Sequence, residues 1–174
     1  WDGVPIKDLT EKKAAQYRNK FLGFIFQSFN LINYKSAVEN VALPLYYQKV
    51  GRKERQEKAL NYLERVGLKE WATHLPSELS GGQKQRIGIA RALAAEPTFI
   101  ICDEVTSALD QLVAEGILRL LARLQDELSL TYMFITHDLA TVRAISDEVV
   151  VMKDGRVVEQ GEKEEMFQPP HHPY

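Results

Sequence analysis

Apolar residues fall into two patterns along this chain, and each pattern predicts a different kind of element. Short continuous apolar runs are typical of strands buried in a parallel sheet, and the chain has three of them, at 22–26, 99–102 and 132–136. Apolar residues at helical spacing predict three helices, at 52–66, 111–128 and 138–146. Because strands and helices alternate after residue 97, we predict an α/β fold with a mostly parallel sheet.

The stretch between residues 27 and 97 departs from this alternation, because its pattern is helical throughout. It predicts a further helix over 36–50 and another from Ser80 to about Ala95, which Pro97 ends. We interpret this stretch as a helical subdomain inserted into the sheet domain. The predicted organisation is a partial sheet core at 1–30, a helical subdomain at 31–96, and the rest of the core at 97–174.

Weaker patterns predict four further elements: a helix at 11–20, a loop at 76–78, a β-hairpin formed by 149–152 and 156–159, and a short helix at 162–168. The hairpin is expected because its two strands flank a Lys-Asp-Gly turn, and Asp-Gly favours the tight turn of a hairpin. The tail that follows is expected to be irregular. Met133 and Met152 are expected in the core.

Composition narrows the class of protein. A chain of 174 residues, 45% hydrophobic and 26% charged, has the length and balance of an ordinary globular domain. The formal charge of −2 gives no reason to expect a nucleic-acid partner or binding to an anionic membrane. No apolar stretch approaches the roughly 20 residues needed to span a bilayer, and there is no signal peptide. We therefore expect a cytosolic protein that reaches a membrane only through a partner.

The single cysteine, Cys102, lies inside an apolar run. One cysteine excludes a disulfide framework within the chain. We expect a buried, reduced thiol.

The string Leu79-Ser80-Gly81-Gly82-Gln83 opens the predicted helix at 80–95. The first N–H groups of a helix point outward and attract anions such as phosphate. An ordinary alternative is a capped helix in which Ser80 is the cap and the glycines only permit the turn. By itself the Ser-Gly-Gly sequence favours that alternative.

The apolar run at 99–102 ends abruptly in two carboxylates, Asp103 and Glu104. Open α/β sheets bind ligands at the carboxyl ends of their strands. An aspartate there is suited to holding Mg²⁺, and the next residue is placed to act as a general base on a water molecule. The alternative is a solvated strand end with two incidental acids, which is a common arrangement.

Three further candidates also have ordinary explanations. Gln27 follows the first predicted strand and could be a polar strand end. His137 directly follows the strand at 132–136, where a histidine is usually structural. The segment Ser107–Asp110 could be a helix N-terminus with Ser107 as its cap.

Taken together, these motifs resemble those of the ATP-binding-cassette (ABC) ATPases. The string at 79–83, continued as Lys-Gln-Arg-Ile-Gly-Ile-Ala-Arg-Ala-Leu, resembles the family's signature motif, and Phe99–Asp103 resembles its Walker B strand. The resemblance runs from about Gly3 to Gly161, with the family's order and spacing. It implies a P-loop NTPase-like (RecA-like) sheet core with an inserted α-helical subdomain, and an ATPase that powers a transporter.

The resemblance also implies a set of sites and two cofactors, ATP and Mg²⁺. In the family, the signature motif faces the γ-phosphate held by the opposite subunit, so that two chains enclose two ATP molecules head to tail. The implied catalytic residues are Glu104, His137 and Gln27; the implied nucleotide contacts are Ser80, Gly81, Gly82, Gln83 and Asp110; and the implied metal site is Asp103 with Gln27.

One family motif is missing from the sequence. No glycine is followed by lysine, so there is no G-x-x-x-x-G-K-[ST] loop to hold the β- and γ-phosphates. In the family this loop lies upstream of the segment that corresponds to Trp1. We therefore expect a fragment whose sheet core lacks its N-terminal part. Val105 is a smaller departure, since many relatives have proline there.

The implied partners are a second ABC ATPase subunit, identical or different, and membrane-spanning permease subunits, with a periplasmic or extracellular substrate-binding protein as a further candidate. The implied location is the cytoplasmic face of the cell membrane. Two alternatives stay open: a non-enzymatic remnant that only completes a partner's ATP site, and a non-transport ABC ATPase acting on DNA or ribosomes. The short helical insertion argues against the second.

Two segments resemble different subfamilies. Residues 24–45 resemble cassettes of lipoprotein-releasing and macrolide-exporting systems. Residues 137–161 and the tail at 167–174 resemble importers of oligopeptides, dipeptides and nickel. The tail is the more distinctive of the two, and it favours an importer.

Overall fold

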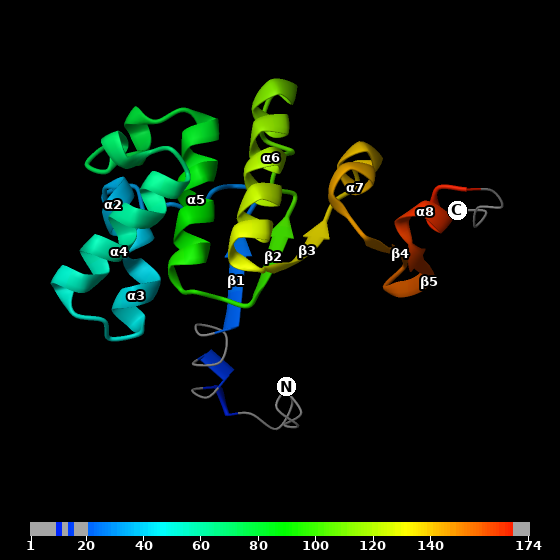
Figure 1. The fold of residues 1–174 in the computed structure, drawn as a ribbon, viewed down its shortest axis with the longest axis horizontal. Helices are drawn as coiled ribbons and strands as arrows, with labels where there is room; N and C mark the ends of the chain where they lie inside the picture. Colours follow the sequence, from blue (N-terminus) through cyan, green and yellow to red (C-terminus); the bar gives the residue numbers. More distant parts are fainter. Residues whose placement is uncertain (1–9, 12–13, 16–20, 169–174) are drawn as a thin grey trace. The chain divides into compact units, whose positions relative to one another are not determined.

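Figure 1 shows a computed structural model of the chain, which describes residues 10–11, 14–15 and 21–168. Most of the helix expected at 11–20 and the tail expected to be irregular lie outside the described residues. The chain divides into two compact units, Trp1–Ile135 and Thr136–Tyr174, and each is described here by itself. Within the described part of the chain, no helix is long and apolar enough to cross a membrane.

The first unit is built on a parallel sheet of three strands, in the order β1-β2-β3 (Figure 1). Its strands are β1 (Leu22–Ile25), β2 (Phe99–Asp103) and β3 (Thr131–Ile135). Ile25 pairs with Cys102, and Asp103 pairs with Ile135. The three predicted strands and their parallel arrangement are confirmed, and their carboxyl ends meet at one edge of the sheet.

One face of this sheet is well buried. Ile25, Ile100 and Cys102 are at most 1% exposed, because side chains at alternate positions of a strand share a face. The hydroxyl of Tyr132, which pairs with Ile100, donates to the Leu121 carbonyl at 3.2 Å. That carbonyl belongs to α6 (Gln111–Leu128), which covers this face. Cys102 is a buried free thiol, as expected, and its burial raises its pKa.

The opposite face is more open than its apolar sequence predicts. Met133 and Ile135 are 41% and 50% exposed, and Met152 in the second unit is 60% exposed. The prediction that both methionines lie in the core is therefore wrong. For Met133 the reason is the two-residue period of a strand, which puts it on the face that the described residues leave open.

The helical region lies between β1 and β2 in the chain. It contains four α-helices: α2 (Ala37–Val41), α3 (Leu43–Tyr47), α4 (Arg52–Arg65) and α5 (Gly81–Ala94). The prediction of a single helix over 36–50 is wrong, because the helix is interrupted at Ala42, which separates α2 from α3. Pro44 sits in the first turn of α3, where its missing N–H costs nothing, whereas inside one long helix its ring would clash with the carbonyl of Asn40. The loop predicted at 76–78 is instead a short 3₁₀ helix, η3 (Pro76–Glu78).

Helix α5 is the centre of the first unit. It packs against α2, α3 and α4 in the helical region and against β1 and α6 in the sheet region (Figure 1). The largest fully buried aliphatic side chains of the helical region share this core: Leu45, Leu63, Ile87, Ile89 and Leu93. The sheet and the helical region are therefore joined through one buried helix.

The second unit contains α7 (Leu139–Ile145), β4 (Glu148–Lys153), β5 (Arg156–Glu162) and α8 (Lys163–Met166). Strands β4 and β5 pair antiparallel, so the predicted hairpin is confirmed. Asp154 and Gly155 both have positive φ, at 50° and 74°. Two successive positive φ values define the tight hairpin turn that Asp-Gly favours.

Candidate functional site

The carboxyl edge of the parallel sheet brings together three of the predicted site residues. Asp103 ends β2, and Glu104 follows it. Gln27 lies two residues beyond Ile25, as Glu104 lies two residues beyond Cys102, and Ile25 pairs with Cys102. Parallel register therefore brings Gln27 and the two carboxylates to the same edge of the sheet. Gln27 and Asp103 are exposed, and Glu104 is half-buried.

The backbone at Glu104 is strained and held from two sides. Its φ is 45°, in the left-handed region that side chains other than glycine seldom adopt. Its N–H donates to the Ile135 carbonyl at 2.9 Å, and its own carbonyl accepts from the Ser107 hydroxyl at 2.8 Å. Such strain persists only where the surroundings enforce it, and it gathers at functional sites.

The start of α5 is a complete capping box. The Ser80 hydroxyl accepts from the Gln83 N–H at 3.3 Å, and the Gln83 side-chain oxygen accepts from the Ser80 N–H at 2.8 Å. The first bond within the helix runs from Lys84 N–H to the Ser80 carbonyl. The N–H groups of Gly81 and Gly82 therefore have no partner within the helix, which is the arrangement that suits an anion.

The two glycines let this helix start approach the loop that follows Glu104. A Cβ atom on Gly82 would lie 2.7 Å from Val113 Cγ1, and one on Gly81 would lie 3.4 Å from Leu109 Cδ2. Asp110 caps α6 by accepting the Val113 N–H at 3.0 Å. The alternative in which Ser107 is the cap of this helix is therefore wrong.

Two polar side chains, which sequence reasoning missed, hold the loop after Gln27. Arg91 of α5 donates to the carbonyls of Asn30 at 2.6 Å and Phe29 at 3.0 Å. Asn40 of α2 is fully buried and accepts the Ile32 N–H at 2.8 Å. The only signal for these contacts in the sequence was a polar residue at a helix position where the periodicity predicts an apolar one. Burial lowers the pKa of Arg91.

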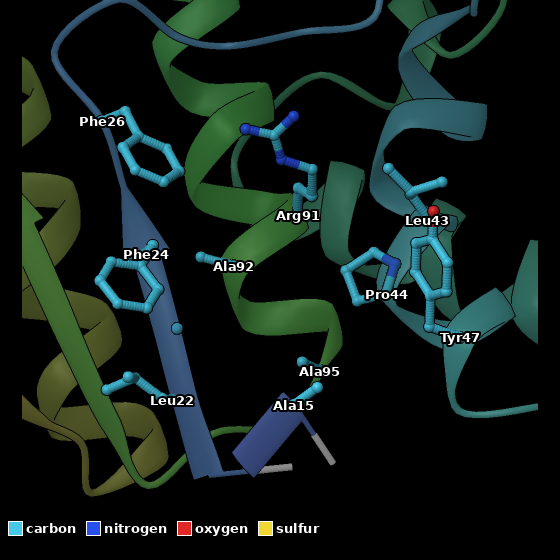
Figure 2. Close-up of a pocket in the computed structure, with 11 residues that line it drawn as sticks. Ala15, Leu22, Phe24, Phe26, Leu43, Pro44, Tyr47, Arg91, Ala92 and Ala95 are labelled. Carbon is cyan, nitrogen blue, oxygen red and sulfur yellow. The ribbon is translucent and has the colours of Figure 1, made fainter. Parts of the chain in front are cut away.

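Arg91 also lines an apolar pocket of about 490 Å³ behind that loop (Figure 2). The pocket lies between β1, α3 and α5. Figure 2 shows Phe24 and Phe26 on the β1 side, Arg91 and Ala92 on α5 with Ala95 just after it, and Leu43, Pro44 and Tyr47 on α3. Because Phe26 directly precedes Gln27, the pocket borders the candidate site but is not part of it.

His137 belongs to the second unit, where it is exposed. The next residue, Asp138, caps α7 by accepting from the Ala140 N–H at 3.0 Å and the Thr141 hydroxyl at 2.6 Å. The hydrogen bond from the Thr141 side chain, followed by that from the Ala140 N–H, lowers the pKa of Asp138. The sheet edge of the first unit thus assembles Gln27, Asp103 and Glu104, and a role for His137 there stays a prediction.

The described residues contain no group of three or more His, Cys, Asp or Glu side chains arranged to hold a metal ion. Mg²⁺ does not need such a group, because it usually keeps several waters and takes one or two protein oxygens beside substrate phosphates. The Asp103 carboxylate and the Gln27 amide oxygen at one sheet edge are a donor set of that kind.

Comparison with known proteins decides the family. A family model described as ABC transporter matches residues 1–107, more than half of the chain. This chain belongs to the ABC transporter family. The resemblance predicted from the motifs is therefore confirmed, and the α/β fold is that of the P-loop NTPase-like ABC cassettes.

The chain is also similar to curated proteins. The methionine import ATP-binding protein MetN 1 of Oenococcus oeni is 46% identical over 166 residues, covering 95% of this chain and 47% of the relative. The chain spans about half the length of the curated relatives it matches. These relatives are named for methionine import, a substrate that the sequence analysis did not single out.

Two solved structures have the same fold. The ATP-binding cassette MJ0796, solved as a dimer in a post-hydrolysis state with ADP and Pi, matches with a TM-score of 0.81 and 38% identity, over 93% of this chain and 71% of that one. The protein cbiO1 of Clostridium perfringens, part of the ABC transporter complex cbiONQ, matches with a TM-score of 0.84 and 34% identity, over 96% and 66%.

Proposed function

We propose that this chain belongs to the ATP-hydrolysing subunit of an ABC importer. The observation that carries the proposal is the parallel register of β1, β2 and β3, which places Gln27, Asp103 and Glu104 at one sheet edge. The capped start of α5, in the same unit, supplies outward-facing N–H groups for a phosphate. Family membership supports ATP as the nucleotide.

The proposed reaction is hydrolysis of the γ-phosphate. A water oxygen bonds to the γ-phosphorus while the bond from that phosphorus to the bridging oxygen breaks, and a proton of the water passes to the Glu104 carboxylate. ADP and inorganic phosphate are the products. Gln27 orients the water, and His137 donates a hydrogen bond toward the γ-phosphate. Such reactions depend mainly on positioning and charge stabilisation.

Mg²⁺ would be held by Asp103 and Gln27, and when bound it neutralises negative charge on the phosphates. We place Ser80, Gly81, Gly82 and Gln83 against the γ-phosphate bound by a second subunit, with Asp110 at the seam between the two chains. The N–H groups of Gly81 and Gly82 have no partner within the helix and would be available to that phosphate. The dimeric state of the similar cassette MJ0796 supports this arrangement.

The proposed partners are a second ATPase subunit and membrane-spanning permease subunits, which would hold this protein at the cytoplasmic face of the membrane. The protein cbiO1, which is part of a transporter complex, supports a permease partner. The names of the relatives support import, with methionine as the first substrate to test and a substrate-binding protein as a further partner.

The test is Mg-ATP hydrolysis by the protein expressed from its native gene, compared with its Glu104→Gln variant. Removal of a general base lowers turnover by about 100-fold or more, so the variant should bind ATP, form a dimer and hardly turn over. Glu115→Gln is the matched control, because Glu115 is an exposed acid paired with Arg119 on the surface of α6.

Turnover of the Glu104→Gln variant at the wild-type rate would refute the role of Glu104. Wild-type protein that forms no dimer with ATP and hydrolyses none would refute the proposed function itself. Hydrolysis that appears only after mixing with a different ATPase subunit would favour the alternative in which this chain completes a partner's site.

A further inference from the structure

A fully buried amide interrupts the apolar inner face of α5. Gln85 is 0% exposed, and its neighbours on the helix, Ile87 and Ile89, are buried to the same degree. Burying an amide without hydrogen bonds is costly. The hydrogen bonds of Gln85 therefore indicate what this side chain does.

Gln85 bonds to the backbone next to the proposed general base. Its Nε2 donates to the Val105 carbonyl at 2.9 Å, and Val105 is 4% exposed. The carbonyl of Glu104, one peptide earlier, is already held by the Ser107 hydroxyl. Two consecutive carbonyls are thus fixed, and with them the orientation of the strained Glu104 backbone.

The other end of the Gln85 amide is unsatisfied. Among the described residues, no donor lies within hydrogen-bond distance of its Oε1, although that atom is buried. An apolar side chain of the same size would avoid this cost. Loss of the side chain would remove this cost but would leave the buried Val105 carbonyl without its donor, so the two effects on stability oppose each other. What Gln85 supplies is the fixed position of that carbonyl.

The same helix carries the candidate phosphate-binding end. Gln85 lies one turn beyond Gly81 and Gly82, whose close approach to Leu109 and Val113 joins the helix start to the loop after Glu104. Any movement of the helix start would reach the Glu104 backbone through Gln85. A buried hydrogen bond in a well-packed helix transmits such a movement with little loss.

We propose that Gln85 is a positioning residue for ATP hydrolysis, which sets the place of Glu104 relative to the start of α5. This inference rests on the proposed function. It assigns to one hydrogen bond the coupling of Glu104 to the helix start that, in the proposed dimer, faces the phosphate bound by the second subunit. In this account Gln85 acts through the backbone of Val105 and Glu104.

The test is Gln85→Met in the protein expressed from its native gene. Methionine keeps the volume and loses the donor, so kcat per ATP-binding site should fall about 10-fold, the value of one hydrogen bond of about 1.4 kcal/mol in a rate. The KM for Mg-ATP should change less than 2-fold, and Tm should stay within a few degrees. Ile89→Met, an equally buried change on the same helix without a polar group, should leave kcat and KM unchanged.

A second variant, Gln85→Asn, keeps an amide on a side chain too short to reach the Val105 carbonyl. If Gln85→Met does not fold, the kcat of Gln85→Asn tests the proposal instead. Wild-type kcat in either folded variant would overturn the proposal, as would a loss of kcat that only follows a loss of ATP-binding sites. Absence of hydrolysis in the wild-type protein would refute the proposed function, not the role of Gln85.

Discussion

The two halves of the candidate site are built in opposite ways. The start of α5 is local, because Ser80 and Gln83 satisfy each other across a single turn. The sheet edge is non-local, because Gln27 and Asp103 come to one edge only through the pairing of β1 with β2. The helix start can form from a few adjacent residues. The sheet edge forms only when the whole first unit is folded and keeps its strands in register.

Loss of Arg91 should have the largest effect on stability. It should loosen the loop after Gln27 at the sheet edge and leave the start of α5 unchanged. Arg91→Met leaves the carbonyls of Phe29 and Asn30 without their donor. We expect the free energy of unfolding to fall by about 2–3 kcal/mol, since bonds to charged donors are strong. Amide hydrogen exchange of residues 28–35 should rise most.

Arg91→Lys is the matched control for that change. Lysine keeps the charge but lacks the planar fork that serves two carbonyls. It should restore less than half of the lost stability. Full restoration would mean that the charge, and not the two-carbonyl clamp, holds the loop.

Adding a single carbon at Gly82 should lower stability by a moderate amount by disturbing the packing of the start of α5. In Gly82→Ala the new Cβ would lie 2.7 Å from Val113 Cγ1, so the loop at the start of α6 must shift. We expect a loss of about 1–3 kcal/mol, typical of overpacking. Gly81→Ala is the matched control, because its Cβ finds room 3.4 Å from Leu109, and equal Tm values for the two variants would contradict this account.

Loss of the helix cap should have a smaller effect that stays local. Ser80→Ala removes the acceptor for the Gln83 N–H and should cost about 1 kcal/mol. Urea unfolding measures the loss, and Ser77→Ala in η3 provides an exposed serine as control. If hydrogen exchange also rises around Gln27, the two halves of the site are not independent.

Acid should weaken a third local structure, the Asp138 cap of α7, by the smallest amount. Its pKa lies below the usual 3.8, chiefly because of the Thr141 hydroxyl. A carboxyl group whose pKa is lower in the folded state than in the unfolded state stabilises the fold at any pH above its unfolded-state pKa. This stabilisation is lost as the pH falls through the folded-state pKa. The stability difference between wild type and Asp138→Asn should therefore be constant above about pH 4.5 and shrink below it, as followed by urea unfolding.

Agreement between sequence and structure follows the same division. The helix that starts after Ser80 and the hairpin turn at Asp154 and Gly155 depend on a few adjacent residues, and both were predicted correctly. The Ser80 cap, considered as the ordinary alternative for this motif, is present as well. The break between α2 and α3 was missed although Pro44 signalled it, because the apolar spacing on both sides fits one helix. The assignment of Ser107 as a cap failed because its hydroxyl bonds back to Glu104.

The sequence by itself determined the family and most of the strand and helix pattern, and it supplied candidate residues for the chemistry, because motifs and periodicity are properties of adjacent positions. Only the tertiary structure decided which side chains hold that chemistry in place. In the sequence, Arg91 and Gln85 are ordinary polar residues of a helix. Their roles follow from the carbonyls of Phe29 and Val105, which the folded structure places within hydrogen-bond distance of them. Packing brings those carbonyls from distant parts of the chain, and no local pattern encodes their approach.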